Sequence, residues 1–569
     1  MRTAVPGDRT GGPPQDDSLE LGTSGLAEHP ALAAGVVVHP PMPGGADDAP
    51  WVVQRGDQRY LRVGRDAGAL LRLLDGSRGH AALAGLLGPR WTTEQVGAAL
   101  LAFDRMGLIA DGAGPAVAPR TRRRRVSYSP PFTVHITLAD PARFLDRLRP
   151  VAQRVFGRAG RAGALLLAVF GVCVLAARSG EVGHALGHPL PLRDYVVFSV
   201  ALLITTALHE LGHGAVLSCF GGKPSRLGIM LFYLTPTFFC DVSDGWRLPR
   251  REQRAWTALA GVAVQSTVAG AAAAGSLLLT PGGAREGVLA FAAMTYLHGL
   301  LNLIPFVKFD GYIALMSIVD ISHLRLKAMT DARRWAARML FGGRYERELP
   351  GLRWAVPFGL CCLAFPVYLV GTAMYLWLDV VLRAGVPGAV ALVALLGYLG
   401  YRLAAGGLLV LQEARSAGAG TVRLAAVAGA VLLGAAAMLA WVQVPYHLSA
   451  GYVRDGDRVR VLLPAGADTA ALRTGMPVSF TRSGVGLSTE LARGQLTGTT
   501  GQSADAPVTA FLPVVTSRTR LPATAYPAST AAASVLPPAG SVVLHAGDLP
   551  LGRWIAQVYG APIVRVLTG

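Results

Sequence analysis

The stretch VVFSVALLITTALHELGHGAV, residues 196–216, is apolar and long enough to cross a bilayer, yet three ionisable side chains lie near its end. The whole chain is more apolar than an average soluble protein, with 52% apolar and 15% charged residues. This run begins near Tyr195, and the others begin near Ala162, Ala255, Val288, Ala355, Val386 and Leu424. Because the first run is short and the sixth is interrupted by Tyr398 and Arg402, the sequence predicts a mainly α-helical polytopic membrane protein with six or seven spans.

The basic residues predict the orientation of the spans. They concentrate in segments 120–125, 221–254 and 310–353, whereas the alternate loops hold few of them. By the positive-inside rule these segments and the N-terminus are cytoplasmic, and with seven spans the tail from Gln443 lies outside the cell. The preference for arginine over lysine suggests a bacterial protein, so we expect a multi-pass location in the cell membrane. The Arg122–Arg125 run directly precedes the first span, which favours a juxtamembrane patch over binding of nucleic acid.

The ionisable groups of the second span form a metal-binding pattern. His209 and His213 are four residues apart, so on a helix both imidazoles project from one face and are able to share one Zn²⁺. Glu210 would then stand beside the open position of the metal as a general base, as in His-Glu-x-x-His metallohydrolases. The alternative is a pair of ordinary core histidines. It is disfavoured because two imidazoles and a carboxylate would then be buried at membrane depth without a ligand.

A third zinc ligand is expected at the end of the fourth span, in LNLIPFVKFDGY, residues 301–312. Pro305 ends or kinks the helix there, and Gly311 permits a close turn, so that Asp310 is free to turn back toward the metal. The second and fourth spans are predicted to run in the same direction, which places the two motifs at similar depth.

The two motifs together resemble those of the site-2 protease family of intramembrane zinc metalloproteases. The resemblance covers residues 195–320 and implies that His209, His213 and Asp310 bind zinc and that Glu210 activates the attacking water. It also implies that Asn302 holds the substrate backbone or the oxyanion, although a helix-capping or interhelical hydrogen bond is an equal alternative for this residue. His298 is close enough in sequence to approach the site, but a packed core histidine is the favoured interpretation. Segment 227–246 resembles the membrane-associated hairpin that offers an edge to an extended substrate.

Two further segments flank the predicted membrane region. Residues 51–63 alternate like two strands around Gly56-Asp57, a leucine-rich helix stopped by Gly76 follows, and Thr92 with Gln95 forms a capping-box pattern. This order resembles winged-helix, PqqD-like domains that bind the leaders of ribosomally made peptides, with a DNA-binding winged helix as the alternative. The Gly- and Pro-rich tail with short Val-rich runs predicts a β-rich domain, faintly similar to the barrel portions of secretion adaptor proteins.

Seven segments are therefore expected. They are a disordered segment 1–50, a PqqD-like winged-helix domain 51–112, a basic juxtamembrane linker 113–160, a catalytic membrane core 161–320, a basic cytoplasmic loop 321–353, additional transmembrane helices 354–442 and a β-rich extracytoplasmic domain 443–569.

The resemblance implies a zinc-dependent intramembrane endopeptidase. The favoured substrate is a ribosomally synthesised precursor peptide in a bacterial natural-product pathway, for example of the daptide type, with the lipid bilayer and export machinery as further partners. One alternative is the cleavage of a transmembrane anti-sigma factor. Another is a non-catalytic membrane peptide receptor or export component.

Overall fold

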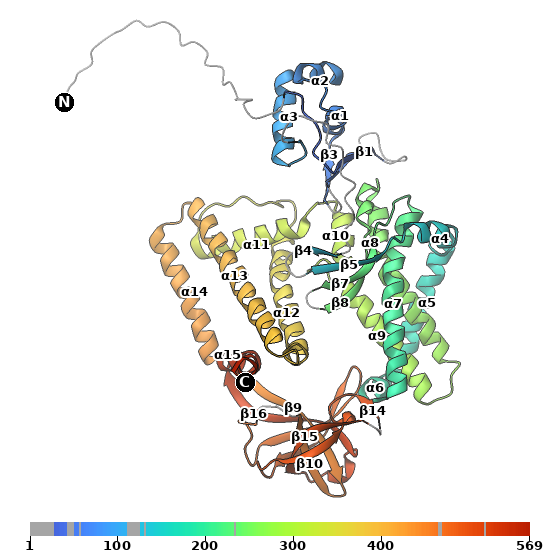
Figure 1. The fold of residues 1–569 in the computed structure, drawn as a ribbon, viewed down its shortest axis with the longest axis vertical. Coiled ribbons are helices and arrows are strands. Elements are labelled where there is room, and N and C mark those ends of the chain that lie inside the picture. Colours follow the sequence, from blue (N-terminus) through green and yellow to red (C-terminus); the bar gives the residue numbers. More distant parts are fainter. Residues whose placement is uncertain are drawn as a thin grey trace, which may run out of the picture. The chain divides into compact units, whose positions relative to one another are not determined.

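The computed structural model describes residues 28–41, 51–55, 59–110, 126–129, 133–232, 235–464, 469–516 and 519–568 (Figure 1). The chain divides into two compact units, the first formed by residues 1–124 with 246–250 and the second by the remainder.

The first unit contains a three-stranded antiparallel sheet and three helices. The strands are β1 (Val36–His39), β2 (Trp51–Arg55) and β3 (Arg59–Val63), in the order β1-β2-β3. The helices are α1 (Arg65–Leu73), α2 (His80–Leu87) and α3 (Thr93–Arg105). The predicted hairpin is confirmed by the β2–β3 pairing, and the predicted capping box is confirmed by reciprocal hydrogen bonds between Thr92 and Gln95.

The boundary predicted for this domain at residue 51 is wrong. Val36–His39 lies within the segment expected to be disordered, yet it pairs with β2 along its whole length. Residues 1–27 and 42–50, which complete that segment, lie outside the described residues. A strand of four residues flanked by prolines and glycines has too little periodicity to be found from sequence, and its stability comes from the sheet that it joins.

Six helices of the described residues are long and apolar enough to cross a membrane. They are α5 (Arg158–Ala177), α7 (Leu192–Cys219), α8 (Arg251–Ser276), α12 (Ala355–Leu382), α13 (Val386–Ser416) and α14 (Thr421–Trp441). The predicted fourth span forms α9 (Gly283–Asn302), which packs against α8 but is not among the six. Arg285 and Glu286 in its first turn shorten its apolar stretch.

The segment expected to be a basic linker, residues 113–160, is folded where the structure describes it. It contains β4 (Val126–Ser129), β5 (Thr133–Ala139) and α4 (Ala142–Val155). The strands join β7 (Leu227–Phe232) and β8 (Thr235–Cys240) in a sheet of order β4-β5-β7-β8. Leu145 of α4 is buried against Gly214 of α7, whereas the arginines and the larger apolar residues Phe144, Leu148, Val151 and Val155 of this helix are exposed. A linker interpretation based on charge therefore missed an amphipathic helix and half of a sheet.

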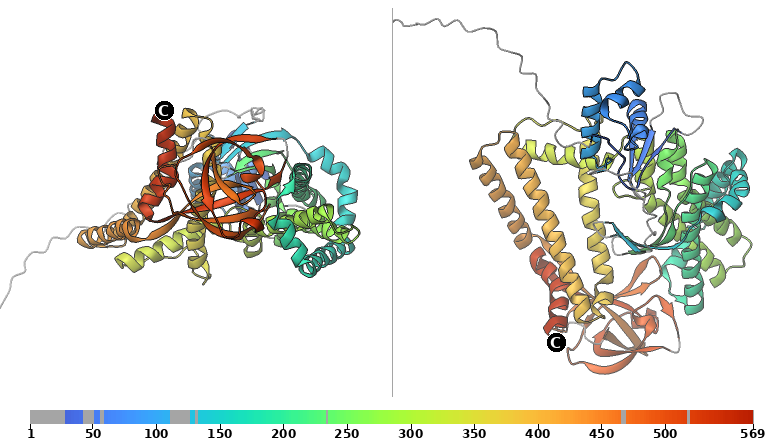
Figure 2. Two further views of the ribbon diagram at one scale, coloured as in Figure 1. Left: turned by 90° about the horizontal axis from the view of Figure 1, so that it is seen from below. Right: turned by 45° about the horizontal axis from the view of Figure 1, so that its top comes forward.

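The segment expected to be a cytoplasmic loop, residues 321–353, is also mostly helical. Helix α10 (Asp310–Val319) is followed by α11 (Leu324–Phe341), which lies across α12, α13 and α14 in both Figure 1 and Figure 2. Asp331 of α11 is buried and accepts hydrogen bonds from the backbone N–H groups of Glu348 and Leu349. Of the arginines in this region, Arg325, Arg333, Arg334 and Arg338 are therefore carried by a helix, and Arg344, Arg347 and Arg353 follow it.

The C-terminal region is β-rich, as predicted. Its strands are β9 (Gln443–Asp455), β10 (Arg458–Pro464), β11 (Pro477–Ser483), β12 (Ser488–Leu496), β13 (Gln502–Pro507), β14 (Val514–Val515), β15 (Arg520–Ser529) and β16 (Ala539–Pro550). The order β10-β9-β16-β11-β12-β15 closes on itself because β10 also pairs with β15, and Figure 2 shows the resulting barrel from below. Tyr452, Phe480 and Leu496 fill its core.

The last residues of the region predicted to be β-rich are helical. Residues 551–568 form α15 (Leu551–Ile555), a π-helical turn (Ala556–Gly560) and α16 (Ala561–Thr568). Ile563 of α16 packs among Met374, Leu378 and Leu392 of α12 and α13. The barrel is also joined to the start of α7, because β14 pairs in parallel with β6 (Leu190–Pro191), which follows α6 (Ser179–Gly187).

Candidate metal and catalytic site

Three side chains from two distant parts of the chain meet beside α8. His209 and His213 project from one face of α7, and Asp310 is the first residue of α10. His209 Nε2 lies 2.9 Å from Asp310 Oδ2, and His213 Nε2 lies 3.3 Å from Asp310 Oδ1. The two Nε2 atoms are 3.1 Å apart. The structure therefore brings together the three side chains that the sequence analysis selected as zinc ligands.

The separations of these atoms suit a divalent zinc ion. With zinc–ligand bonds of about 2.0–2.1 Å, atoms at two corners of a tetrahedron lie about 3.3 Å apart. The three observed separations, 2.9, 3.1 and 3.3 Å, lie at or slightly below that value. In addition, Asp310 Oδ2 is buried, and its close polar neighbour is His209 Nε2. The donor set and its geometry therefore fit a zinc ion with one position left for water or substrate.

His213 is held in the tautomer that a metal ligand needs. Its Nδ1 lies 2.8 Å from the backbone carbonyl oxygen of Thr257 in α8, and a carbonyl oxygen only accepts, so Nδ1 carries the proton. The Nε2 atom is then left with its lone pair directed at His209 and Asp310. Hydrogen bonds of this kind orient metal-binding histidines and raise their basicity.

The His209 ring is fixed by close packing against the same helix. A Cβ atom placed on Gly261 of α8 would lie 2.4 Å from His209 Nε2. Only glycine leaves space for the imidazole at this position. Both histidines are nearly inaccessible, with 3% of His209 and 5% of His213 exposed.

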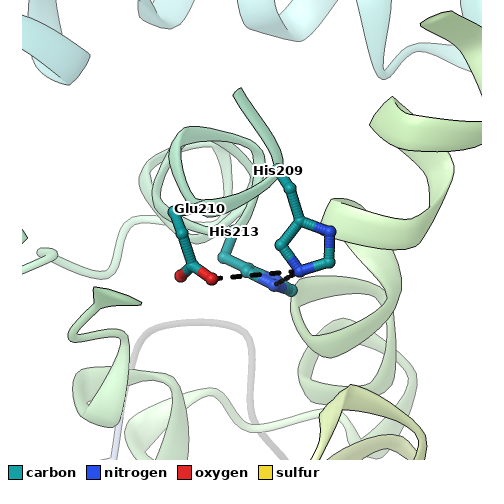
Figure 3. Close-up of side chains that lie close together, drawn as sticks. All are labelled: His209, Glu210 and His213. Atoms are coloured by element: carbon teal, nitrogen blue, oxygen red, sulfur yellow. Dashed lines mark hydrogen bonds and ion pairs between the residues drawn. The ribbon is translucent and has the colours of Figure 1, made fainter. Parts of the chain in front are cut away.

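Glu210 lies beside the histidine pair. Figure 3 shows it beside the two histidines. Its Oε1 atom lies 4.0 Å from His209 Nε2. The other oxygen, Oε2, accepts a 2.8 Å hydrogen bond from the backbone N–H of Cys240, the last residue of β8. One carboxylate oxygen is thus anchored by the sheet while the other faces the histidine pair.

The hairpin that anchors Glu210 is itself held by a buried ion pair. Arg226 Nη2 lies 2.9 Å from Asp241 Oδ2, and only 7% of each side chain is exposed. Burial alone would raise the pKa of Asp241, but hydrogen bonds from Ser243, Arg226 and Ser225 outweigh it and hold the pKa below its usual value. Burial raises the pKa of the Cys240 thiol, and the neighbouring Glu210 raises it further. Cys240 therefore contributes its backbone N–H and a neutral thiol.

The turn that presents Asp310 depends on Gly311, as the sequence predicted. A Cβ atom on Gly311 would lie 2.0 Å from the carbonyl oxygen of Leu303, so the backbone passes closer here than any side chain allows. The helix α9 ends at Asn302, three residues before Pro305. The chain then turns and begins α10 at Asp310.

Two other candidate residues are not brought into the cluster by any described contact. Asn302 is half-buried at the end of α9, and within the described residues its side chain makes no hydrogen bond. His298 Nδ1 lies 3.2 Å from Gln265 Nε2, and the ring is near enough to His209 and Asp310 to interact with both electrostatically. The hydroxyls of Thr205 and Thr206 donate to carbonyl oxygens one turn back in α7, and Gly212 and Gly214 lie in close contact with Val264 and Leu145.

Three positions that shape the site were not found from sequence. Gly261, Thr257 and Cys240 act through the absence of a side chain, a backbone carbonyl and a backbone N–H, respectively. Backbone groups and a missing side chain cannot be recognised from the type of residue in the sequence. The spacing of Gly261 within an Ala- and Gly-rich helix was the only available indication of close packing at this point.

Comparison with known proteins found no similar protein. No family model matches the chain, and neither a curated protein nor a solved structure matches it.

Proposed function

We propose that the protein is a zinc-dependent endopeptidase that works within the membrane. The observation that supports this proposal is the convergence of His209, His213 and Asp310 at separations suited to zinc, with Glu210 beside them. A protein that only binds a metal needs the three ligands but does not need a carboxylate such as Glu210 beside them. When bound, zinc would supply Lewis acidity, lowering the pKa of water toward about 7 and polarising a carbonyl group.

The residues of the chain have distinct roles in this proposal. His209, His213 and Asp310 would hold the ion, and Thr257 would keep His213 in the required tautomer. Glu210 would accept a proton from the attacking water through Oε1 and return it to the leaving amine, while Cys240 holds Oε2 in place. A carboxylate with one oxygen anchored and one free is preorganised for this transfer.

The sheet offers a way to present a peptide bond in extended form. The N–H of Asp241 bonds to Arg226 on the β7 side, whereas the N–H of Cys240 points to Glu210 on the opposite side. Because strand residues alternate, the backbone groups of Phe238 face the same side as Glu210. Among the described strands none pairs with this edge of β8. An extended substrate would add a strand there, beside the cluster.

The proposed substrate is a ribosomally synthesised precursor peptide, and the first unit carries this part of the proposal. Its strand β1 already covers the β2 side of the hairpin, so the outer edge of β3 is left for a leader. Deleting residues 1–115 should impair cleavage of a leader-bearing peptide more than cleavage of a generic transmembrane peptide. Equal impairment would instead favour a membrane-protein substrate such as an anti-sigma factor.

The catalytic part is tested by changing Glu210→Gln in the full chain. The variant should keep its zinc, because Glu210 is not a ligand, and should lose at least about 10²-fold in turnover, the usual contribution of general acid–base catalysis. Glu413→Gln, which changes a carboxylate of α13 outside the cluster, is the matched control and should remain active. Turnover by Glu210→Gln at the wild-type rate would contradict the proposed base.

A further inference from the structure

The C-terminal barrel contributes to a cavity that lies away from the histidine cluster. Its volume is about 330 Å³, and it lies between the barrel and the short segment that precedes α7. Tyr452, Arg482 and Ser541 of the barrel and His188 of that segment supply polar groups to its wall. Prolines, an alanine and a glycine form much of the remainder. This volume is within the range of sites for small ligands.

The cavity carries one positive charge that no carboxylate neutralises. Arg482 Nη1 donates a 2.7 Å hydrogen bond to His188 Nε2, while His188 Nδ1 lies 2.8 Å from the carbonyl oxygen of His184. The carbonyl oxygen accepts the Nδ1 proton, which leaves Nε2 to accept the hydrogen bond from Arg482. None of the residues lining the cavity is acidic, and among the described residues Arg482 has no ion-pair partner. Most of its five N–H donors remain available.

Tyr452 also lines the cavity, and its hydroxyl is buried in the wall. Its side chain is fully buried and packs edge to face on Phe480, with 5.2 Å between ring centroids. Its hydroxyl has no hydrogen-bond partner among the described residues. Burial raises the pKa of Tyr452 to about 12, so the hydroxyl keeps its proton. A buried hydroxyl without an acceptor lowers stability, and a bound acceptor would remove that cost.

The other polar groups of the wall are already engaged. Ser541 donates to Ser483 Oγ at 2.9 Å, and Thr481 donates to the carbonyl oxygen of Ser541 at 3.2 Å. The free donors are therefore one guanidinium and one phenol. They match a singly charged planar acceptor, because a carboxylate takes two parallel hydrogen bonds from a guanidinium. A phosphate carries up to two charges near neutral pH and would leave part of its charge unpaired.

We propose that this cavity binds the carboxylate end of a peptide, with Arg482 as its ion-pair partner and Tyr452 as a neutral donor. The cavity has room for about eleven water molecules at about 30 Å³ each, which corresponds to on the order of ten non-hydrogen atoms. That is the size of one or two small residues. Since none of these groups belongs to the histidine cluster, this site is independent of the proposed catalytic function.

Isothermal titration calorimetry on the full-length protein in detergent tests the site with four probes: Ala-Ala, its C-terminal amide, acetate and inorganic phosphate. Ala-Ala should bind at least about tenfold more tightly than its amide, because only the free acid pairs with Arg482. It should also bind more tightly than acetate, which leaves most of the cavity empty, and more tightly than phosphate. Equal affinity of the acid and the amide would overturn the proposal, and tighter binding of acetate or phosphate would overturn the assignment to a peptide end.

Two variants link this binding to the cavity. Arg482→Gln should weaken Ala-Ala binding at least about tenfold, whereas Arg493→Gln should not, because Arg493 is exposed and paired with Glu490 outside the cavity. Tyr452→Phe removes only the unpartnered hydroxyl, so the thermal midpoint should be equal to or higher than that of the wild type while affinity falls several-fold. Wild-type affinity in either Arg482→Gln or Tyr452→Phe would contradict the proposed site.

Discussion

Replacing Gly261 by alanine should damage the site without weakening the helix that carries it. The added Cβ would lie 2.4 Å from His209 Nε2, 2.5 Å from Cε1 and 2.6 Å from Cδ2. Non-bonded heavy atoms prefer separations of about 3.5–4.0 Å, so the imidazole would have to retreat by about 1 Å. The ring has little freedom to do so, because it is buried between α7 and α8.

The size of the effect follows from this displacement. Metal–ligand distances are held to within about 0.2 Å, so a shift of about 1 Å removes His209 from the ligand set. A misplacement of about 1 Å also costs about 10² in rate. Alanine is about 1 kcal/mol better than glycine in a helix interior, which means that loss of helix propensity would not explain a defect. We therefore expect reduced zinc content and at least about 10²-fold lower turnover.

The assay compares purified Gly261→Ala with Gly275→Ala, a substitution in the same helix. A Cβ on Gly275 meets nothing within 4 Å, so this control carries the same chemical change without the contact. Zinc per protein is measured by elemental analysis, turnover with a reporter transmembrane peptide, and folding by thermal unfolding. A Gly261→Ala protein with full zinc content and turnover within about twofold of wild type would refute the argument from His209 packing.

The remaining predictions concern groups that support the cluster. Asp310→Ala should lower the zinc content of the purified protein, and normal zinc stoichiometry would remove Asp310 from the ligand set. Gly311→Ala should lower zinc content as well, although no ligand is changed, because its Cβ would overlap the Leu303 carbonyl; unchanged zinc content would show that the turn adapts. The pKa of Asp241 is depressed in the folded protein, so its stabilising effect is present above the unfolded pKa of about 3.9 and is lost as pH falls through the lower folded pKa. The difference in thermal midpoint between wild type and Asp241→Asn should therefore shrink below about pH 4, and a difference that is the same at pH 3 and pH 7 would contradict this assignment.

Charge placement made the ligand cluster predictable from sequence. His209, Glu210 and His213 stand out because ionisable groups are rare at membrane depth, and their spacing fixes a common helix face. Asp310 could be joined to them because Pro305 and Gly311 indicate where the chain leaves a helix and turns. In both cases the signal is a residue type that would destabilise an apolar helix at that position unless the fold required it.

The partners of the hairpin were not predictable in the same way. Strand β5 pairs with β7 across more than 80 residues of sequence, and pairing of that kind depends on tertiary packing that no local pattern encodes. Helix α4 was masked by its arginines, which suggested a linker although the opposite face of the helix is apolar. Helix α11 was missed for the same reason. Charge density predicted a side of the membrane for these segments but gave no information on whether they fold.

The residues that shape the cluster lie outside the two sequence motifs, so the motifs alone do not define the site. Helix α8 contributes no charged ligand, yet its Thr257 carbonyl sets the proton on His213, and the space at Gly261 receives His209. The sheet contributes one backbone N–H, which orients Glu210. A chain with the same two motifs but a bulkier residue at position 261 would keep every predicted ligand and lose their convergence. To predict the site, one therefore needs the ligands and also the packing of α8, a helix that carries none of them.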